Sequence, residues 1–308
     1  MVRVLYIMGT GRSGSTVLDS LLGNHEAMVT TGELSDLPLI GWVYGDYCAC
    51  GVPASRCPFW TKVRIEWSRR TGGKDLVEDY CSCQTRFHRL RYLPRLLKEA
   101  TLQSGHFKTY SRWTQVLFEI ICELSGKQVV IDSSKSPARA FALSLNPALD
   151  VRLVHLVRDA RGVAWSRKRT ISKEELTPNA VPTQPSPIWR SAIQWMCVNL
   201  VSEWVGSRFP PGRSVRVRYE DFVTRPREVL SLIGHLCGLN LSALGRLCEN
   251  GQAMNIGHIV SGNRVRMAGQ VHLRQDTEWM NRMSAKERNT VWRLAGWLLQ
   301  HYGYAREP

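Results

Sequence analysis

A loop rich in glycine and hydroxyl side chains stands near the start of the chain, directly after an apolar run. The loop reads GTGRSGST and covers residues 9–16, and the apolar run covers residues 4–8. Its glycines allow the backbone to approach a ligand closely. A helix that begins here adds free N–H groups and the positive end of its dipole, and Ser15 and Thr16 add hydroxyl donors. We therefore expect the loop to bind an anion.

The spacing of this loop differs at one position from that of nucleoside-triphosphate-binding loops. Those loops follow the pattern GxxxxGK[ST], in which the lysine contacts the terminal phosphates. Gly9 and Gly14 keep the spacing, but Ser15 stands in place of the lysine, and Arg12 is the basic residue of the loop. A tight strand-to-helix turn without a ligand is the alternative. The density of glycine and hydroxyl residues favours an anion site.

The order of apolar strands and helical patterns predicts an α/β fold with a central parallel β-sheet flanked by helices. We expect strands at residues 3–8, 128–132, 151–157 and 215–219. We expect helices at residues 14–24, 86–103, 111–125, 136–146, 159–169, 188–206 and 284–302, a loop-rich stretch at residues 34–83 and a proline-rich loop at residues 177–187.

Three of these strands are followed by polar residues suited to anions. They are the loop 9–16, the stretch 132–136 and the segment that starts at Arg158. Ligands of parallel α/β sheets bind beyond the carboxyl ends of the strands. We therefore expect the three segments to meet at one site.

The composition is that of a folded protein with a substantial core. The chain has 308 residues, of which 44% are hydrophobic and 22% charged, and we expect a single domain over residues 1–308. No stretch approaches the roughly 20 apolar residues of a membrane span, and the start of the chain lacks a signal-peptide cleavage site. These features predict a cytoplasmic protein without a membrane span.

The net charge is strongly positive, with 41 Lys+Arg against 26 Asp+Glu, a formal +15. This excess favours an anionic ligand, and a basic surface spread over the solvated face is the alternative. The chain shows no recognisable nucleic-acid-binding module, so we do not expect nucleic acid as a partner.

Nine cysteines fall into two groups. For the five cysteines that cluster within residues 48–83 we expect free thiols. Their CxC spacing differs from that of the common CxxC zinc knuckle, and a disulfide is unusual in a reducing compartment. A structural zinc site and a disulfide stay open as alternatives. We expect the others to be small core residues. The clustered cysteines are Cys48, Cys50, Cys57, Cys81 and Cys83, and the others are Cys122, Cys197, Cys237 and Cys248.

Together these motifs resemble those of the sulfotransferases that use 3′-phosphoadenosine 5′-phosphosulfate (PAPS). The first loop is similar to the one that grips the 5′-phosphosulfate in this family. A second signature, an arginine at a strand end and a serine eight residues later, matches Arg158 and Ser166 and implies binding of the 3′-phosphate. A glycine-containing basic loop late in the chain is similar to residues 261–266. The donor-binding residues implied are Gly11, Arg12, Ser13, Gly14, Ser15, Thr16, Arg158, Ser166, Gly262, Asn263, Arg264 and Arg266.

The resemblance runs in element order from about residue 4 to residue 305 and is closest to the bacterial and tyrosylprotein-type branch. It implies a P-loop NTPase-like sulfotransferase fold and direct in-line transfer of a sulfuryl group from PAPS to an acceptor hydroxyl. The nucleotide product is 3′-phosphoadenosine 5′-phosphate (PAP), and no metal is expected. Helical insertions within residues 34–125 would form the acceptor side.

The same resemblance implies three catalytic residues. Glu33, in the stretch TGEL, matches a GEE-type motif and would be the base. Lys135, in DSSKSP, matches the lysine that polarises the bridging oxygen. Arg12 would hold the sulfuryl oxygens. For Glu33 a helix cap or a surface ion pair is the alternative, and for Lys135 an ordinary solvated lysine.

Two other functions stay open, and the acceptor is not determined. A P-loop kinase would phosphorylate a small alcohol with Mg-ATP and use Asp132 for magnesium, although Asp132 also suits a cap for the turn that follows it. A non-catalytic nucleotide- or nucleic-acid-binding protein would bind anions over a broad basic face. The acceptor hydroxyl could belong to a phenol or other small molecule, a glycan, a lipid or a peptide, and the oligomeric state is open.

Overall fold

A computed structural model of the chain describes residues 1–169 and 184–307. Residues 177–183 of the predicted proline-rich loop lie outside these ranges. Five parallel strands form the central sheet in the order β2-β3-β1-β4-β5, which confirms the predicted α/β fold. The strands are β1 (Val2–Gly9), β2 (Met28–Thr30), β3 (Val129–Lys135), β4 (Leu149–Val157) and β5 (Ser214–Arg218), and β6 (Met254–Asn255) and β7 (Gln270–Val271) form a separate antiparallel pair.

Side chains of β1 alternate between two cores, as the period of a strand requires. Val4, Tyr6 and Met8 pack on one face of the sheet, and Leu5 and Ile7 pack on the other. The first face is covered by α5 (Gly105–Ser125), α6 (Pro137–Ser144) and α8 (Ile188–Gly206), and the second by α1 (Ser15–Leu22), α10 (Pro226–Cys237) and α11 (Ser242–Glu249). Burial on both faces explains why the strand reads as a continuous apolar run.

The prediction of a loop-rich stretch at residues 34–83 is wrong. That stretch contains the π-helical turn η1 (Leu37–Val43), α2 (Pro58–Thr71) and most of α3 (Val77–His88). Helix α2 buries Trp60, Val63 and Trp67, whose spacings of three and four residues place them on one helix face. Residues 86–103 are also not one helix, because extended Arg89 separates α3 from η2 (Leu90–Tyr92) and α4 (Leu93–Thr101).

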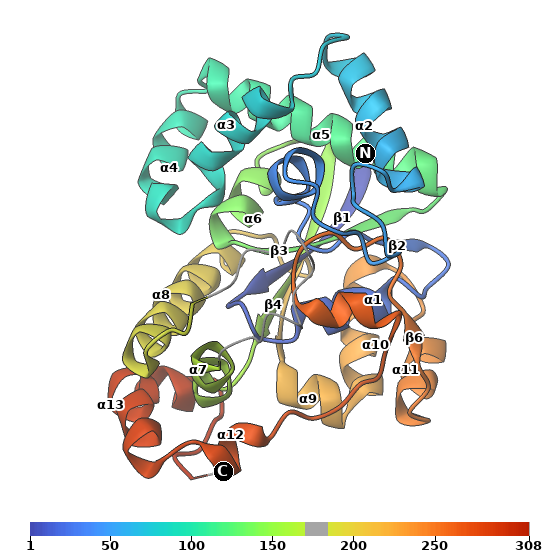
Figure 1. The fold of residues 1–308 in the computed structure, drawn as a ribbon. Coiled ribbons are helices and arrows are strands. Elements are labelled where there is room, and N and C mark those ends of the chain that lie inside the picture. The colour runs from blue at the N-terminus through green and yellow to red at the C-terminus, as the bar shows by residue number, and fades with distance from the viewer. Residues whose placement is uncertain (170–183, 308) are drawn as a thin grey trace.

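Helices lie on both sides of the central sheet (Figure 1). Helices α2 to α5 lie at the top of the view. Helices α7 (Ala160–Lys168) and α13 (Ala285–His301) lie at the bottom, where they share a third apolar cluster with α8. The remaining elements are α9 (Tyr219–Thr224), η4 (Arg264–Ala268) and α12 (Glu278–Arg282).

The four cysteines outside the cluster differ in burial. Cys237 and Cys248 are buried as predicted, but Cys122 is half-buried and Cys197 is exposed on α8, so the core assignment is wrong for Cys197. Within the described residues no helix is both long and apolar enough to cross a bilayer.

Candidate functional site

The glycine loop between β1 and α1 has a backbone that few other sequences could adopt. Gly9 has φ of 147°, and a Cβ there would stand 2.3 Å from the carbonyl oxygen of Leu156. Gly14 has φ of 89° at the N-cap of α1, and a Cβ there would stand 2.6 Å from the ring of Tyr219. Arg12 is also left-handed, with φ of 75°. For a residue with a side chain this costs about 1–2 kcal/mol, and such strain concentrates at binding sites.

Polar groups at the end of this loop fit an anion. Ser15 and Thr16 are buried in the first turn of α1. The hydroxyl oxygen of Ser13 is buried and has no hydrogen-bond partner among the residues that the structure describes. A buried polar group without a partner costs free energy, and a ligand that accepts its hydrogen bond would remove this cost.

Two cations approach the loop from neighbouring elements. Both lie beside Gly11: a Cβ atom added to this glycine would stand 3.3 Å from the guanidinium of Arg167 and 4.0 Å from Cε of Lys135. Lys135 was predicted at the site, but Arg167 on α7 was missed. Burial and the charge of Arg12 lower the pKa of Arg167 to about 10. The loop therefore faces several positive groups held close together.

Lys135 is the last residue of β3 and lies beside the end of β1, where it pairs in register with Met8. Its φ is 67°, a second left-handed residue with a side chain at this site. The Lys135 ammonium forms an ion pair with the Glu33 carboxylate. The two side chains are 17% and 18% exposed, so the pair is largely withdrawn from water. The structure thus brings together two of the three predicted catalytic residues.

The backbone before Glu33 is fixed by hydrogen bonds to α1 and β3. The N–H of Gly32 donates to the Asp19 carboxylate at 2.9 Å, and its carbonyl oxygen accepts from the Ser133 N–H at 2.9 Å. Asp19 also accepts from the hydroxyl groups of Ser133, at 2.6 Å, and Thr30. Asp19 is fully buried, and burial raises its pKa to about 7. We did not predict this role for Asp19, although an acid on the apolar face of α1 was a visible signal.

The electrostatic surroundings of Glu33 suit a general base. Burial raises the pKa of Glu33, and the nearby Asp36 carboxylate acts in the same direction. The positive charge of Lys135 acts against them. A carboxylate whose pKa is shifted toward neutrality accepts a proton more readily.

The late basic loop lies over the start of α1 and Glu33. The Asn263 N–H donates to the hydroxyl of Thr16 at 3.3 Å. Gly262 has φ of 99°, and a Cβ there would stand 3.2 Å from both Thr16 Oγ1 and Glu33 Oε1. The Ser261 hydroxyl donates to Asp36 at 2.8 Å. This loop therefore closes one side of the site.

This loop continues into η4, which contains two arginines, Arg264 and Arg266. Arg266 is buried, donates to the Gly262 carbonyl oxygen at 3.3 Å and forms a 2.6 Å ion pair with Asp46. It holds the loop against the segment before α2. Arg264 begins η4, and its side chain lies outside the described part of the chain.

Arg158 follows β4 and reaches the glycine loop. It donates to the Arg12 carbonyl oxygen at 2.9 Å, forms a 2.9 Å ion pair with Asp276 and lies over the ring of Tyr219, 4.6 Å from its centroid. Ser166 is half-buried on α7, two turns further on, and is not among these contacts of Arg158. Its pairing with Arg158 on a phosphate stays a prediction.

Asp132 is not placed to hold magnesium. Its carboxylate forms a 3.0 Å ion pair with Arg139, and both side chains are fully buried. It also accepts from the Ser134 N–H at 3.0 Å, as expected of a cap for this turn. The kinase alternative depended on Asp132, so this arrangement does not favour it.

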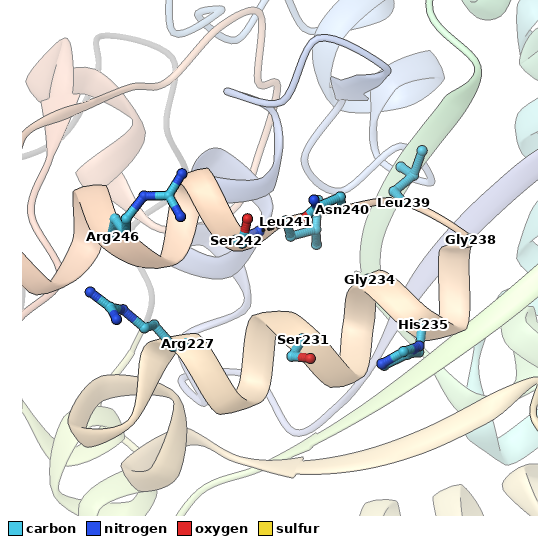
Figure 2. Close-up of a pocket in the computed structure, with 10 residues that line it drawn as sticks. All are labelled: Arg227, Ser231, Gly234, His235, Gly238, Leu239, Asn240, Leu241, Ser242 and Arg246. Atoms are coloured by element: carbon cyan, nitrogen blue, oxygen red, sulfur yellow. Dashed lines mark hydrogen bonds between the residues drawn. The ribbon is translucent and has the colours of Figure 1, made fainter.

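A hollow of about 520 Å³ lies elsewhere, between α10 and α11 (Figure 2). Figure 2 shows Arg227 and Arg246 at one end and Gly238 at the other. Gly238 lies next to Arg3, at the amino end of β1, whereas the glycine loop follows the carboxyl end. None of the residues that line this hollow is a predicted site residue.

Comparisons with known proteins identify a family and a fold that the chain is similar to. A family model described as the sulfotransferase family matches residues 5–243. Among solved structures, the sulfotransferase domain from the curacin biosynthetic pathway is similar with a TM-score of 0.52 and 17% identity, over 99% of each chain. The sulfotransferase domain of the Synechococcus PCC 7002 olefin synthase has a TM-score of 0.47 and 18% identity, over 98% of this chain and 95% of that one. No curated protein sequence matches the chain. At 17% identity, the likeness to the curacin-pathway domain concerns the fold alone.

Proposed function

The chain belongs to the sulfotransferase family, and we propose that it transfers the sulfuryl group of PAPS to a hydroxyl of an acceptor. One observation carries the proposal. The glycine loop, Lys135 and the Glu33 carboxylate meet at the carboxyl ends of three adjacent strands, β1, β3 and β2. This arrangement supports the proposal, because ligands of parallel sheets bind at this edge and these residues would supply an anion cradle, a cation and a base there.

The glycine loop would hold the phosphosulfate of the donor. The backbone N–H groups at the start of α1 and the hydroxyls of Ser15 and Thr16 are suited to its oxygens. The buried Ser13 hydroxyl would gain a partner. Arg12 would contact the sulfuryl oxygens. Arg167, whose guanidinium lies beside Gly11, would add a second forked donor.

The chemical step would be direct transfer in line. The acceptor oxygen forms a bond to sulfur as the bond from sulfur to the bridging phosphate oxygen breaks. The acceptor proton passes to Glu33, and the bridging electron pair stays on the PAP phosphate, where Lys135 stabilises it. Protonation of Glu33 ends its ion pair with Lys135, so the cation becomes available as the leaving oxygen gains charge. We propose that these side-chain cations suffice without a metal.

The 3′-phosphate of the nucleotide would lie between Arg158 and Ser166. Asp276 occupies one nitrogen of Arg158 in the structure, so a bound phosphate would take the place of this carboxylate. The loop that would close over the donor contains Gly262, Asn263, Arg264 and Arg266.

The acceptor would enter from the side of α2 to α5 and could be a small molecule, a glycan, a lipid or a peptide. A cytoplasmic location is part of this proposal.

The test is an activity assay with PAPS and separate panels of phenols, sugars, lipid alcohols and tyrosine peptides. We expect PAP formation that depends on the acceptor and a sulfated product identified by its mass. A phosphorylated product from Mg-ATP, with no product from PAPS, would overturn the proposal.

A further inference from the structure

Three cysteines and a histidine converge beside the loop that covers Glu33. Cys48 and Cys50 follow η1, Cys57 is the N-cap of α2, and His258 lies 201 residues beyond Cys57 in the chain. Their three Sγ atoms and one ring nitrogen all lie within 4.8 Å of one another. Two of the four residues, Cys48 and Cys57, are buried.

Three distances within this cluster are close to those of a tetrahedral metal site. His258 Nδ1 lies 3.4 Å from Cys57 Sγ and 3.7 Å from Cys48 Sγ, and Cys50 Sγ lies 3.6 Å from Cys57 Sγ. Four ligands bound to zinc at about 2.3 Å for sulfur and about 2.0–2.1 Å for nitrogen define a tetrahedron with edges of roughly 3.5–3.8 Å. A disulfide would bring two sulfurs to about 2.05 Å, and all nine cysteines are free thiols.

We propose that Cys48, Cys50, Cys57 and His258 bind a zinc ion through three sulfurs and Nδ1. Four protein ligands leave no position for water or substrate, so the site is structural and not catalytic. CxC spacing alone did not favour zinc, because the fourth ligand comes from a distant part of the chain.

Residues around the cluster hold the ligands in place. Cys57 is the N-cap of α2, where the free N–H groups of the first turn and the helix dipole favour a thiolate. The His258 ring stacks on Phe59 with 5.4 Å between centroids. Its carbonyl oxygen accepts from the Trp60 indole N–H at 2.8 Å. Such outer contacts orient the ligands of zinc sites.

The cluster lies where a bound ion would connect two segments of the chain. Val260, two residues after His258, forms bridges to Gly32 on one side and to Cys48 on the other. Gly32 precedes Glu33, and Gly262 and Asn263 lie on the start of α1. A zinc ion would therefore join the loop over the site to the start of α2. This task does not depend on which donor or acceptor the enzyme uses.

The first test is the metal content of full-length protein without a histidine tag, purified without chelators and measured by mass spectrometry of the elements. We expect about one zinc per chain. Cys50→Ser removes the exposed ligand and should reduce this to under about one tenth, whereas Cys81→Ser, outside the cluster, should leave it unchanged. His258→Ala should lose zinc and His258→Cys should retain it, because sulfur can replace the nitrogen.

A second measurement uses the wild-type protein, so its outcome does not depend on whether a variant folds. Removal of zinc from the wild-type protein should lower its melting temperature, and added zinc or cobalt should restore it, with cobalt showing the visible absorption of a tetrahedral thiolate complex. Protein that contains no zinc, takes up none and reacts equally with thiol reagents with or without zinc would overturn the proposal. A disulfide between two of the three cysteines in the isolated protein would also overturn it.

Discussion

The ammonium of Lys135 and the carboxylate of Glu33 form an ion pair that connects the ends of two neighbouring strands. Lys135 ends β3 in a left-handed conformation, and Glu33 follows β2 after a turn fixed by Asp19. The proposed base for the acceptor and the proposed cation for the leaving group are thereby held in direct contact. The proposed transfer would separate them, since protonation of Glu33 removes its charge.

Substitution of the proposed base should affect the chemical step and spare the binding of the nucleotide. Glu33→Gln keeps the size of the side chain and a hydrogen-bond acceptor for Lys135, but it cannot take up the acceptor proton. We expect kcat to fall by about 10²–10⁴, with PAP affinity unchanged within about threefold. The control is Glu26→Gln, because Glu26 is exposed beyond the end of α1. A Glu33→Gln enzyme with nearly full kcat would exclude Glu33 as the base.

The dependence of the rate on pH should report on Glu33. Because burial raises its pKa, the acid limb of kcat/KM should lie above the ordinary glutamate value of about 4.3. The negative charge of Asp36 contributes to this shift. Asp36→Asn should therefore lower the pKa of Glu33 and move the acid limb to lower pH, while Asp79→Asn on the surface of α3 should not move it. A limb that stays in place in Asp36→Asn would contradict this assignment.

Arg167, which the sequence did not single out, should contribute to donor binding. Its guanidinium lies at the glycine loop, whereas the next residue, Lys168, is exposed and paired with Glu287. A charge-assisted hydrogen bond contributes about 1.5–3 kcal/mol, so Arg167→Gln should weaken PAP binding by about tenfold or more. Lys168→Gln is the matched control and should change it by less than about twofold. Equal effects of the two changes, measured by calorimetry, would place Arg167 outside the donor site.

Asp19 should act as a positioning residue for Glu33. It accepts hydrogen bonds from Gly32, Ser133 and Thr30, and an asparagine offers one acceptor oxygen in place of two. Asp19→Asn should lower the free energy of unfolding by about 1–3 kcal/mol and reduce kcat with little change in KM for PAPS. A parallel loss of kcat and PAPS affinity would indicate a general defect and not a positioning role. Thr30→Ser, which keeps a hydroxyl donor, serves as the control.

The same residue should leave a signature in the dependence of stability on pH. The pKa of Asp19 is about 7 in the fold and about 3.9 in the unfolded chain. Between about pH 4 and pH 7 the Asp19 carboxyl is ionised in the unfolded chain but still largely protonated in the folded protein. Rising pH therefore favours the unfolded chain, and this carboxyl lowers the free energy of unfolding over that range. Denaturant titrations should show this loss to be smaller in Asp19→Asn than in the wild type, and equal slopes would contradict the assignment.

Four of the five strands of the central sheet, and the strand ends that form the candidate site, could be predicted from the sequence because each depends on local patterns. The apolar run before the glycine loop is buried on both faces of β1. Lys135 and Arg158 stand at strand ends, where the fold class places ligand contacts. The buried face of α2 was also visible in the spacing of Trp60, Val63 and Trp67, but glycines and cysteines on either side suggested loops.

The features that could not be predicted depend on contacts between distant segments. Strand β2 has three residues, too few to show alternation, and it gains its place by pairing with β3. Arg139, seven residues after Asp132, takes the carboxylate that a magnesium site would need. His258 reaches Cys57 across 201 residues, so no local spacing could connect them.

Calorimetric titration with PAP and ADP in the presence of EDTA, and with Mg-ATP in parallel, tests the central claim most directly. PAP and ADP both carry two phosphates and differ in where the second one is attached. We predict that PAP binds more tightly than ADP and that Arg158→Ala removes this preference. Binding of Mg-ATP without a response to PAP would contradict the assignment of PAPS as the donor.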